Sequence, residues 1–329
     1  MFSRSKVVAG LTAAALLLTA CSSDSGTTDP TTTAAAGDDS YTIGINQLVQ
    51  HPALDAATEG FKEALAEAGV EVSYDEQNAN GEQATALTIA QQFAGKNLDL
   101  VLAVATPAAQ ATAQNITDIP VLFTAVTDPV SAELVDSEEA PGSNVTGTSD
   151  VAPIEDQLDL LKELVPDART VGIVYASGEV NSQVQVDLAR EAAVSRDLEI
   201  KTQTVTTAND IQQAVEALGD VDAIYVPTDN MVVAGIASLI QVAEQKQIPV
   251  IAAEGGTVEG GAVATLGINY KELGRQTGEM ALRVLRDGAD TATMPVEKAT
   301  EFTYVINEDA AERLGVTIPQ RILDEAETV

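Results

Sequence analysis

Two apolar segments recur in the second half of this chain, and this internal repeat constrains the fold more than any other feature. The run 99–106 (DLVLAVAT) corresponds to 222–228 (DAIYVPT), and 119–121 (IPV) corresponds to 248–250 (IPV). The two correspondences are offset by 123 and 129 residues. This nearly constant offset predicts two similar lobes. The near-continuous apolar runs are typical of parallel strands buried on both faces.

Strand-like and helix-like segments alternate along both halves. Short apolar runs predict strands, and apolar residues spaced by three and four predict helices. Such alternation is typical of doubly wound parallel sheets. We therefore predict an α/β fold with two doubly wound parallel-sheet lobes joined by a hinge. The predicted strands are 41–46, 70–74, 98–105, 121–125, 170–175, 199–205, 222–226, 249–252, 264–268 and 302–306, and the predicted helices are 53–68, 82–94, 107–115, 154–164, 182–195, 210–218, 231–245, 271–286 and 308–314, with a glycine-rich turn at 255–261.

The N-terminal segment has a different character. Arg4 and Lys6 precede an uncharged stretch, 7–20, that is rich in Ala and Leu and too short to span a bilayer. This pattern predicts an export signal peptide over residues 1–20. The segment ends in LTAC at Cys21, which resembles the bacterial lipobox. Cys21 is therefore expected to be acylated and to anchor the chain outside the cell membrane; the alternative is a buried or stray thiol.

Three further segments complete the predicted domain organisation. Residues 21–40 consist almost entirely of Ser, Thr, Ala, Gly and Asp, which predicts a flexible tether. Residues 41–150 are expected to form the N-terminal lobe, and part of 255–285 is expected to cross back to it. Residues 151–329 are expected to form the C-terminal lobe. A cleft between two such lobes permits hinge closure around a ligand.

The formal net charge of −33 at pH 7 restricts the possible partners. A charge of this size opposes binding to nucleic acid and to anionic lipid. Contact with the membrane is therefore expected only through the lipid anchor. We expect the chain to be a monomer.

The sequence contains no catalytic or metal-binding pattern. Its single histidine is His51, and its single cysteine is Cys21. Nucleophilic triads need a correctly placed histidine, and metal sites need clustered ligands. No Walker-type phosphate loop is present. We expect neither enzymatic activity nor a metal or cofactor. His51 follows the first predicted strand, so it either lines a cleft or is a solvated loop residue.

Polar residues gather at the predicted carboxyl ends of the strands, where open α/β sheets bind ligands. Thr106 is expected to be the N-cap of helix 107–115, whose N-terminus attracts anions. Any one of these residues could be a cap or turn residue. Together they favour a zwitterionic ligand, with its carboxylate on the first lobe and its ammonium near Asp229 or Glu254, although a polar uncharged ligand also fits. The candidates are Thr106, Thr127, Asp128, Ser149 and Asp150 in the first lobe, and Tyr175, Asn181, Asp229, Asn230 and Glu254 in the second.

Five motifs carry a family resemblance: QHPALD at 50–55, ATP at 105–107, FTAVTDP at 123–129, NVTG at 144–147 and LGVTIP at 314–319. They resemble the TrpX-like family of ABC-transporter substrate-binding proteins over essentially all of the chain after the tether. The resemblance implies the two-lobed periplasmic-binding-protein type I fold and a ligand among the aromatic or other hydrophobic amino acids. It also implies a cleft formed by Gln47, His51, Thr106, Thr127, Asp128, Ser149, Asp150, Asn181, Asp229 and Asn230.

The sequence thus predicts a lipid-anchored substrate-binding protein that serves an ABC importer permease. A sugar or nucleoside ligand is an alternative. Sugar clefts favour stacking aromatic side chains, and this chain has no Trp, 5 Phe and 6 Tyr. A second alternative is a sensor lipoprotein that presents its liganded form to a membrane receptor.

Overall fold

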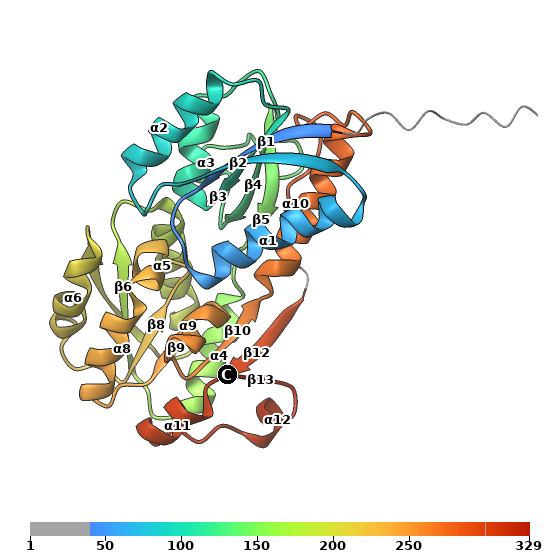
Figure 1. Ribbon diagram of the computed structural model, residues 1–329. Coiled ribbons are helices and arrows are strands. Elements are labelled where there is room, and N and C mark those ends of the chain that lie inside the picture. Colours follow the sequence, from blue (N-terminus) through green and yellow to red (C-terminus); the bar gives the residue numbers. More distant parts are fainter. Residues whose placement is uncertain (1–39, 300) are drawn as a thin grey trace, which may run out of the picture. The chain divides into compact units, whose positions relative to one another are not determined.

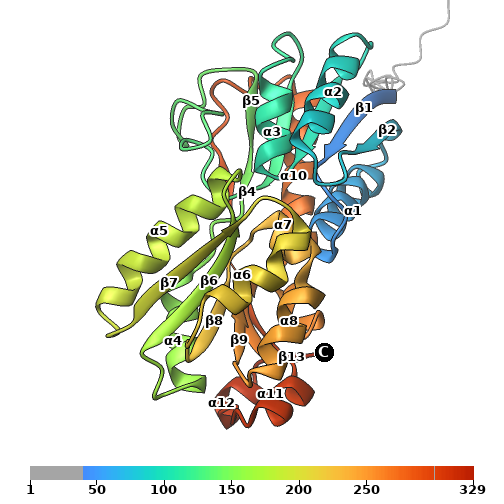
Figure 2. The same cartoon turned by 90° about the vertical axis from the view of Figure 1, so that its left-hand side faces the viewer.

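The computed structural model describes residues 40–299 and 301–329. The predicted signal peptide, the predicted acylation site at Cys21 and the tether up to residue 39 lie outside the described residues. The described chain is built on two sheets, each covered by helices on both faces (Figures 1 and 2). This is the α/β architecture of two doubly wound lobes that the alternating pattern predicts.

The first lobe surrounds a parallel six-stranded sheet with the order β11-β5-β4-β3-β1-β2. Helices α2 and α3 pack together on one face, and α1 and α10 pack together on the other. The strands are β1 (Ser40–Gln47), β2 (Glu71–Asn78), β3 (Leu100–Val104), β4 (Val121–Val126), β5 (Val145–Ser149) and β11 (Glu297–Lys298), and the helices are α1 (Pro52–Glu67), α2 (Gln83–Ala94), α3 (Thr106–Ala113) and α10 (Tyr270–Leu285).

The second lobe surrounds a seven-stranded sheet with the order β13-β12-β10-β9-β8-β6-β7. Only the β10–β12 pairing is antiparallel among the described strands. The strands are β6 (Thr170–Ala176), β7 (Glu199–Val205), β8 (Ala223–Val226), β9 (Val250–Ala252), β10 (Ala264–Ile268), β12 (Phe302–Ile306) and β13 (Glu327–Thr328), and the helices are α4 (Ile154–Leu164), α5 (Val180–Val194), the 3-10 turn η1 (Ala208–Asp210), α6 (Ile211–Ala217), α7 (Asn230–Ala234), α8 (Ile236–Gln245), α9 (Gly255–Glu259), α11 (Glu308–Leu314) and α12 (Gln320–Leu323).

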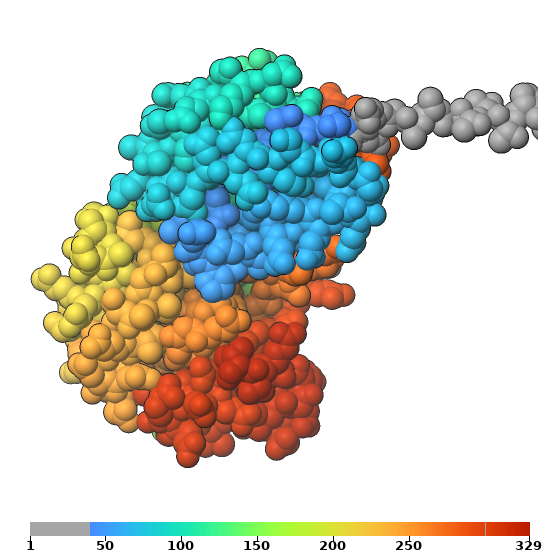
Figure 3. Space-filling view, viewed as in Figure 1, coloured from blue at the N-terminus to red at the C-terminus, as the bar shows by residue number. Residues whose placement is uncertain are grey.

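Over the described residues, the chain passes between the two lobes three times: after β5, between β10 and α10, and between β11 and β12. Helix α10 therefore follows a strand of the second sheet but packs against α1 of the first lobe. Figure 3 shows blue residues of the first lobe meeting yellow and orange residues of the second, and α1 contacts α9 at this boundary. The three crossings form the hinge of the two-lobed fold.

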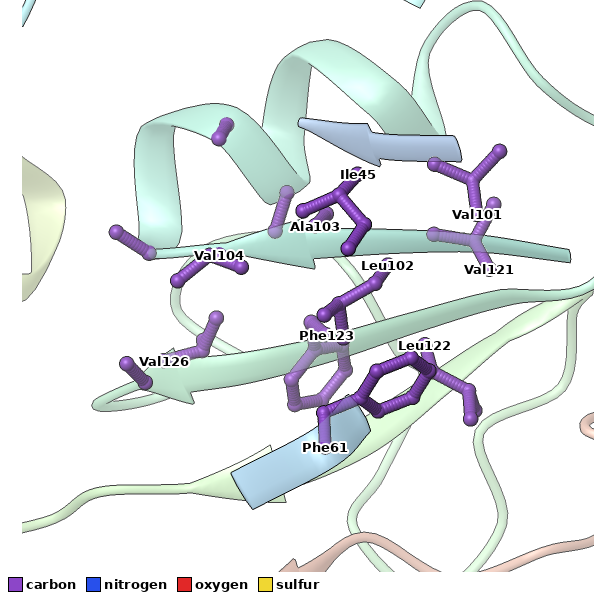
Figure 4. Close-up of a cluster of buried hydrophobic side chains, with 14 of the residues drawn as sticks. Ile45, Phe61, Val101, Leu102, Ala103, Val104, Val121, Leu122, Phe123 and Val126 are labelled. Atoms are coloured by element: carbon purple, nitrogen blue, oxygen red, sulfur yellow. The ribbon is translucent and has the colours of Figure 1, made fainter. Parts of the chain in front are cut away.

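Buried aliphatic and aromatic side chains fill each lobe. In the first lobe, Phe61 of α1 reaches the sheet beside Leu122 and Phe123 of β4 (Figure 4), and all three are fully buried. Helices α1 and α10 approach closely because Gly274 faces α1. A Cβ atom at Gly274 would lie 1.9 Å from the carbonyl oxygen of Ala57. This close packing fixes the position of α10, whose first residue lies at the cleft.

The structure corrects the sequence-based prediction for the glycine-rich segment after Glu254, where a turn was expected. Residues Gly255–Glu259 form helix α9. The Glu254 side chain caps this helix by accepting hydrogen bonds from the backbone N–H groups of Gly256 and Thr257. Glutamate is not a common N-cap residue, so the local sequence did not indicate a helix start. The predicted helix 231–245 is likewise two helices, α7 and α8, which meet at Gly235.

Candidate functional site

A small enclosed cavity lies where the two lobes meet. Its volume is about 10 Å³, far below the 300–1,000 Å³ that is usual for ligand pockets. Residues of both lobes form its wall because the carboxyl ends of the parallel strands in each sheet face the same region. The lining residues are His51, Ala53, Leu54, Ala125 and Asp150 from the first lobe, Thr228, Asn230, Val233 and Glu254 from the second, and Tyr270 at the start of α10.

Asp150 and Tyr270 lie on two of the three segments that cross between the lobes, and a hydrogen bond links them. The Tyr270 hydroxyl donates a hydrogen bond of 2.7 Å to Asp150 Oδ2, and Thr127 Oγ1 donates one of 3.1 Å to Asp150 Oδ1. Burial raises the pKa of Asp150, although both hydrogen bonds act in the opposite direction. Burial and the neighbouring Asp150 raise the pKa of Tyr270 well above its usual value. Because each Asp150 oxygen accepts only one side-chain hydrogen bond, each can accept a further one.

Glu254 is the second carboxylate in the cavity wall. Its oxygens accept hydrogen bonds from the N–H groups of Gly256 (2.7 Å) and Thr257 (2.6 Å) and from the Thr257 hydroxyl. Burial raises the pKa of Glu254 despite these bonds. Neither Lys nor Arg occurs among the residues that line the cavity. The two acids therefore lack a cationic partner there.

His51 lies at the start of α1 with its imidazole in the cavity wall. Neither ring nitrogen has a hydrogen-bond partner, and the residue is only 9% exposed. Burial lowers the pKa of His51 to about 4, although the neighbouring Asn230 and Asp55 act in the opposite direction. The imidazole is therefore neutral near pH 7.

Asp229 and Glu179 lie behind the second-lobe wall. Asp229 Oδ2 accepts hydrogen bonds from the N–H of Ala176 (2.5 Å) and the hydroxyl of Ser182 (2.7 Å), and Oδ1 accepts one from Val232 N–H (2.8 Å). Asp229 thus caps α7 and is not among the cavity-lining residues, in contrast to the expected position of a ligand-ammonium partner.

Glu179 forms a second polar cluster with two amide side chains. Its Oε2 accepts hydrogen bonds from Asn230 Nδ2 (2.6 Å) and Asn181 Nδ2 (3.1 Å), and its Oε1 accepts one from Met231 N–H (3.2 Å). Burial and the nearby Asp229 charge raise the pKa of Glu179 to about 8. Asn181 Oδ1 remains without a partner.

Polar contacts between the lobes hold the cleft in a closed arrangement. The Thr127 and Thr228 hydroxyls are 3.5 Å apart, and Gln185 Nε2 donates to both. At the outer edge, Gln83 Nε2 donates a bond of 2.8 Å to the carbonyl oxygen of Gly178. A groove of about 630 Å³ lies beside this contact and is lined by residues of both lobes, including Glu179 and Asn230.

The remaining candidate residues have local structural contacts. Gln47 bonds Asp55 and Thr58 and lines a separate surface pocket. Asp128 caps the following turn through the N–H groups of residues 130 and 131. Ser149 donates to the carbonyl oxygen of Thr127. The Tyr175 hydroxyl donates to Gln183 Oε1.

Thr106 departs from its predicted role as an N-cap. Ala105 is the N-cap of α3 and has φ 80°, and Thr106 is the first helical residue. The Thr106 hydroxyl is buried and has no hydrogen-bond partner. Ala125, at the end of β4, also has a positive φ, of 55°. Such strain in non-glycine residues is concentrated at functional sites, and Ala125 lines the cavity.

Sequence reasoning missed Tyr270, Ala125 and Glu179. Tyr270 belongs to the helix that crosses between lobes, and no local pattern places it beside Asp150. Within residues 40–299 and 301–329, no group of His, Cys, Asp and Glu side chains is arranged to hold a metal ion. No helix in the same part of the chain is long and apolar enough to cross a membrane.

Comparison with known proteins identifies the family. The profile of the ABC transporter substrate binding protein family matches residues 42–329. The chain belongs to this family. Family membership confirms the resemblance to TrpX-like substrate-binding proteins and the absence of an enzymatic role. As a substrate-binding protein of an ABC transporter, the chain is extracytoplasmic.

Three relatives are informative. A tyrosine-binding protein of Clostridioides difficile is 42% identical over 279 residues, which cover 83% of this chain and 81% of that protein. A structure from Streptococcus pneumonia in complex with L-Trp has 37% identity and a TM-score of 0.85, with 88% and 99% of the chains covered. A ligand-free, open substrate-binding protein of Clostridium difficile has 43% identity and the same coverage but a TM-score of only 0.68. The lobes of this chain are therefore arranged more like those of the liganded relative.

Proposed function

We propose that this substrate-binding protein binds an aromatic amino acid between its lobes and, as a lipid-anchored monomer, delivers it to the permease of an ABC importer. The names of the two relatives that bind tyrosine and tryptophan support the ligand class. The observation that carries the proposal is the pair of buried carboxylates, Asp150 and Glu254, in a cavity wall that contains no Lys or Arg and whose one histidine, His51, is neutral. An ammonium group would supply the missing positive charge.

Asp150 is the better partner for the ligand ammonium. Its two oxygens each accept one side-chain hydrogen bond, whereas the Glu254 oxygens together accept three. A carboxylate has about four acceptor positions, so Asp150 has more of them free. Asp150 also bonds Tyr270 on another crossing segment, so an ammonium at Asp150 would lie at the hinge.

The first-lobe edge offers a position for the ligand carboxylate. Thr106 lies at the carboxyl end of β3 with a buried hydroxyl that lacks a partner, and it begins the eight-residue helix α3. A helix N-terminus with a free hydroxyl favours a carboxylate. The aliphatic side chains of Leu54, Ala125 and Val233 provide the apolar wall that an aromatic ring requires. The cavity is too small for such a ligand, so its walls must lie farther apart when the ligand is bound.

A thermal-shift panel tests the ligand class. L-tyrosine or L-tryptophan at a hundred times its dissociation constant should stabilise the fold by about 2.7 kcal/mol. N-acetyl-L-tyrosine should give no shift, because it lacks the ammonium that pairs with Asp150. Stabilisation by glucose or adenosine, without any shift from an amino acid, would instead show a sugar or nucleoside site.

The lipid anchor has an independent test. The wild-type chain, expressed in a bacterium that acylates lipoproteins, should sediment with membranes, and Cys21→Ser should appear in the soluble extracytoplasmic fraction. Multiple acyl chains give firm anchoring, at about 0.8 kcal/mol per buried methylene. Ser23→Ala serves as the matched control and should remain with the membranes. Equal partitioning of wild type and Cys21→Ser would contradict acylation at this residue.

A further inference from the structure

One side chain of the cavity wall has no evident role in the fold. His51 occupies the N-cap position of α1, where Ser, Thr, Asn or Asp commonly bonds the first helical N–H groups. The His51 side chain makes no such bond. Both ring nitrogens are buried, and neither makes a well-formed hydrogen bond, although the imidazole interacts with the neighbouring Asn230 side chain. Because most buried polar groups in native structures are paired, an unpaired one calls for an explanation.

The residues that line the cavity include both an acidic and an apolar set. The carboxylates of Asp150 and Glu254 form the acidic part, together with Tyr270. Ala53, Leu54, Ala125 and Val233 form an apolar part. His51 adds a polar group to this lining, as do Thr228 and Asn230. Such a group does not assist an apolar ring, but it can recognise a polar atom on one.

The charge state of His51 restricts what it recognises. A neutral imidazole presents one N–H donor and one nitrogen acceptor. The acceptor matches the O–H of a phenol or the N–H of an indole. A phenyl ring offers neither group and would leave the imidazole unpaired in the closed cleft. The free-energy cost of that unpaired group would oppose the binding of phenylalanine.

We propose that His51 is a specificity residue that favours aromatic amino acids with a hydrogen-bond donor on the side chain, tyrosine and tryptophan, over phenylalanine. This inference rests on the proposed binding of aromatic amino acids. Sites built to bond a substrate hydroxyl or amine discriminate strongly against analogues that lack it. A contact of His51 with the ligand backbone would give no such discrimination.

Calorimetric titration of the full chain with tyrosine, tryptophan and phenylalanine tests the inference. The wild type should bind tyrosine and tryptophan at least about tenfold more tightly than phenylalanine, as expected for loss of one buried hydrogen bond. His51→Leu should reduce this preference to about twofold or less by weakening tyrosine and tryptophan. His51→Gln retains a donor and an acceptor and should keep part of the preference.

The outcomes separate this inference from the proposed function. Equal wild-type affinity for all three amino acids would overturn the role of His51 but leave the proposed function intact. A uniform loss of affinity for all three amino acids in both variants would also overturn the specificity role of His51 and leave the proposed function intact. It would indicate that His51 contacts groups that the three ligands share. Failure of the wild type to bind any amino acid would refute the proposed function and the inference together.

Discussion

Asp150→Asn is expected to lower the affinity for the aromatic amino acid by roughly 30-fold to several thousand-fold. Removing one partner of a buried, hydrogen-bonded charge pair costs about 2–5 kcal/mol, and each 1.4 kcal/mol is a factor of ten. The loss is large because the ligand ammonium would remain buried without a counter-charge, and no Lys or Arg in the cavity wall offsets the change. Asparagine keeps the size of the side chain and can still accept the hydrogen bond from Tyr270.

Titration calorimetry with the same amino acid on wild type, Asp150→Asn and Asp128→Asn measures this effect. Asp128 also follows a strand of the first sheet, but it caps a turn through residues 130 and 131 and does not line the cavity. Asp128→Asn should therefore bind within about twofold of wild type, since asparagine can still accept the hydrogen bonds of the turn and substitutions that leave buried networks intact have small effects. Wild-type affinity in Asp150→Asn would show that the ammonium lies elsewhere.

The free energy of unfolding of the ligand-free protein is expected to fall between pH 6.5 and pH 8. Burial raises the pKa of Glu179 from 4.5 to about 8, so the folded protein holds a proton that the unfolded chain has lost. Stability falls with pH wherever the folded state binds more protons. Glu179 alone should contribute a loss on the order of 1–2 kcal/mol over this interval. Asp150, Asp229 and Glu254 act in the same direction, because burial raises the pKa of each.

His51 changes the free energy of unfolding in the opposite direction and at lower pH. Its pKa falls from 6.5 to about 4 on folding, so its contribution is complete above pH 6.5 and is lost as the pH falls towards 4. Below pH 6.5, the effects of His51 and of the buried acids on stability oppose one another. Above pH 6.5, only the buried acids change the stability. The interval from 6.5 to 8 therefore isolates the carboxylates.

Urea denaturation at several pH values tests this prediction. Glu179→Gln should reduce the fall in the free energy of unfolding, because glutamine resembles the protonated acid and does not titrate. Glu199→Gln, at an exposed position at the start of β7, should leave the fall unchanged. A wild-type stability that is flat or rises from pH 6.5 to pH 8 would contradict a protonated Glu179.

The lobes and most of their elements follow from local sequence patterns. The predicted bounds of α4, β7, β10, β12 and α11 agree with the structure residue for residue. Their apolar periodicity and flanking breakers are local properties, which a single sequence shows directly. Helix α9 was missed because its cap is a glutamate and its first two residues are glycines. The short strands β11 and β13 depend on pairing with distant strands, so no local signal marks them.

The candidate site was only partly accessible from sequence. Strand-end position predicted that His51, Asp150, Asn230 and Glu254 lie at the cleft, and these four residues line the cavity. Tyr270 lies 120 residues from Asp150 and reaches it only because α10 crosses back to the first lobe. Asp229 follows a strand in the same way as Asp150 does, but its side chain turns back to cap α7. Strand-end position alone cannot distinguish a ligand-facing acid from a capping acid.

A crystal structure of the protein with bound L-tyrosine tests the central claim most directly. We expect the ligand between the two lobes, its ammonium nitrogen within about 3 Å of an Asp150 carboxylate oxygen, as in charge-assisted hydrogen bonds. The cavity should be enlarged around the ring. A ligand seated in the outer groove beside Gly178, with Asp150 bonded only to Thr127 and Tyr270, would contradict the proposed site.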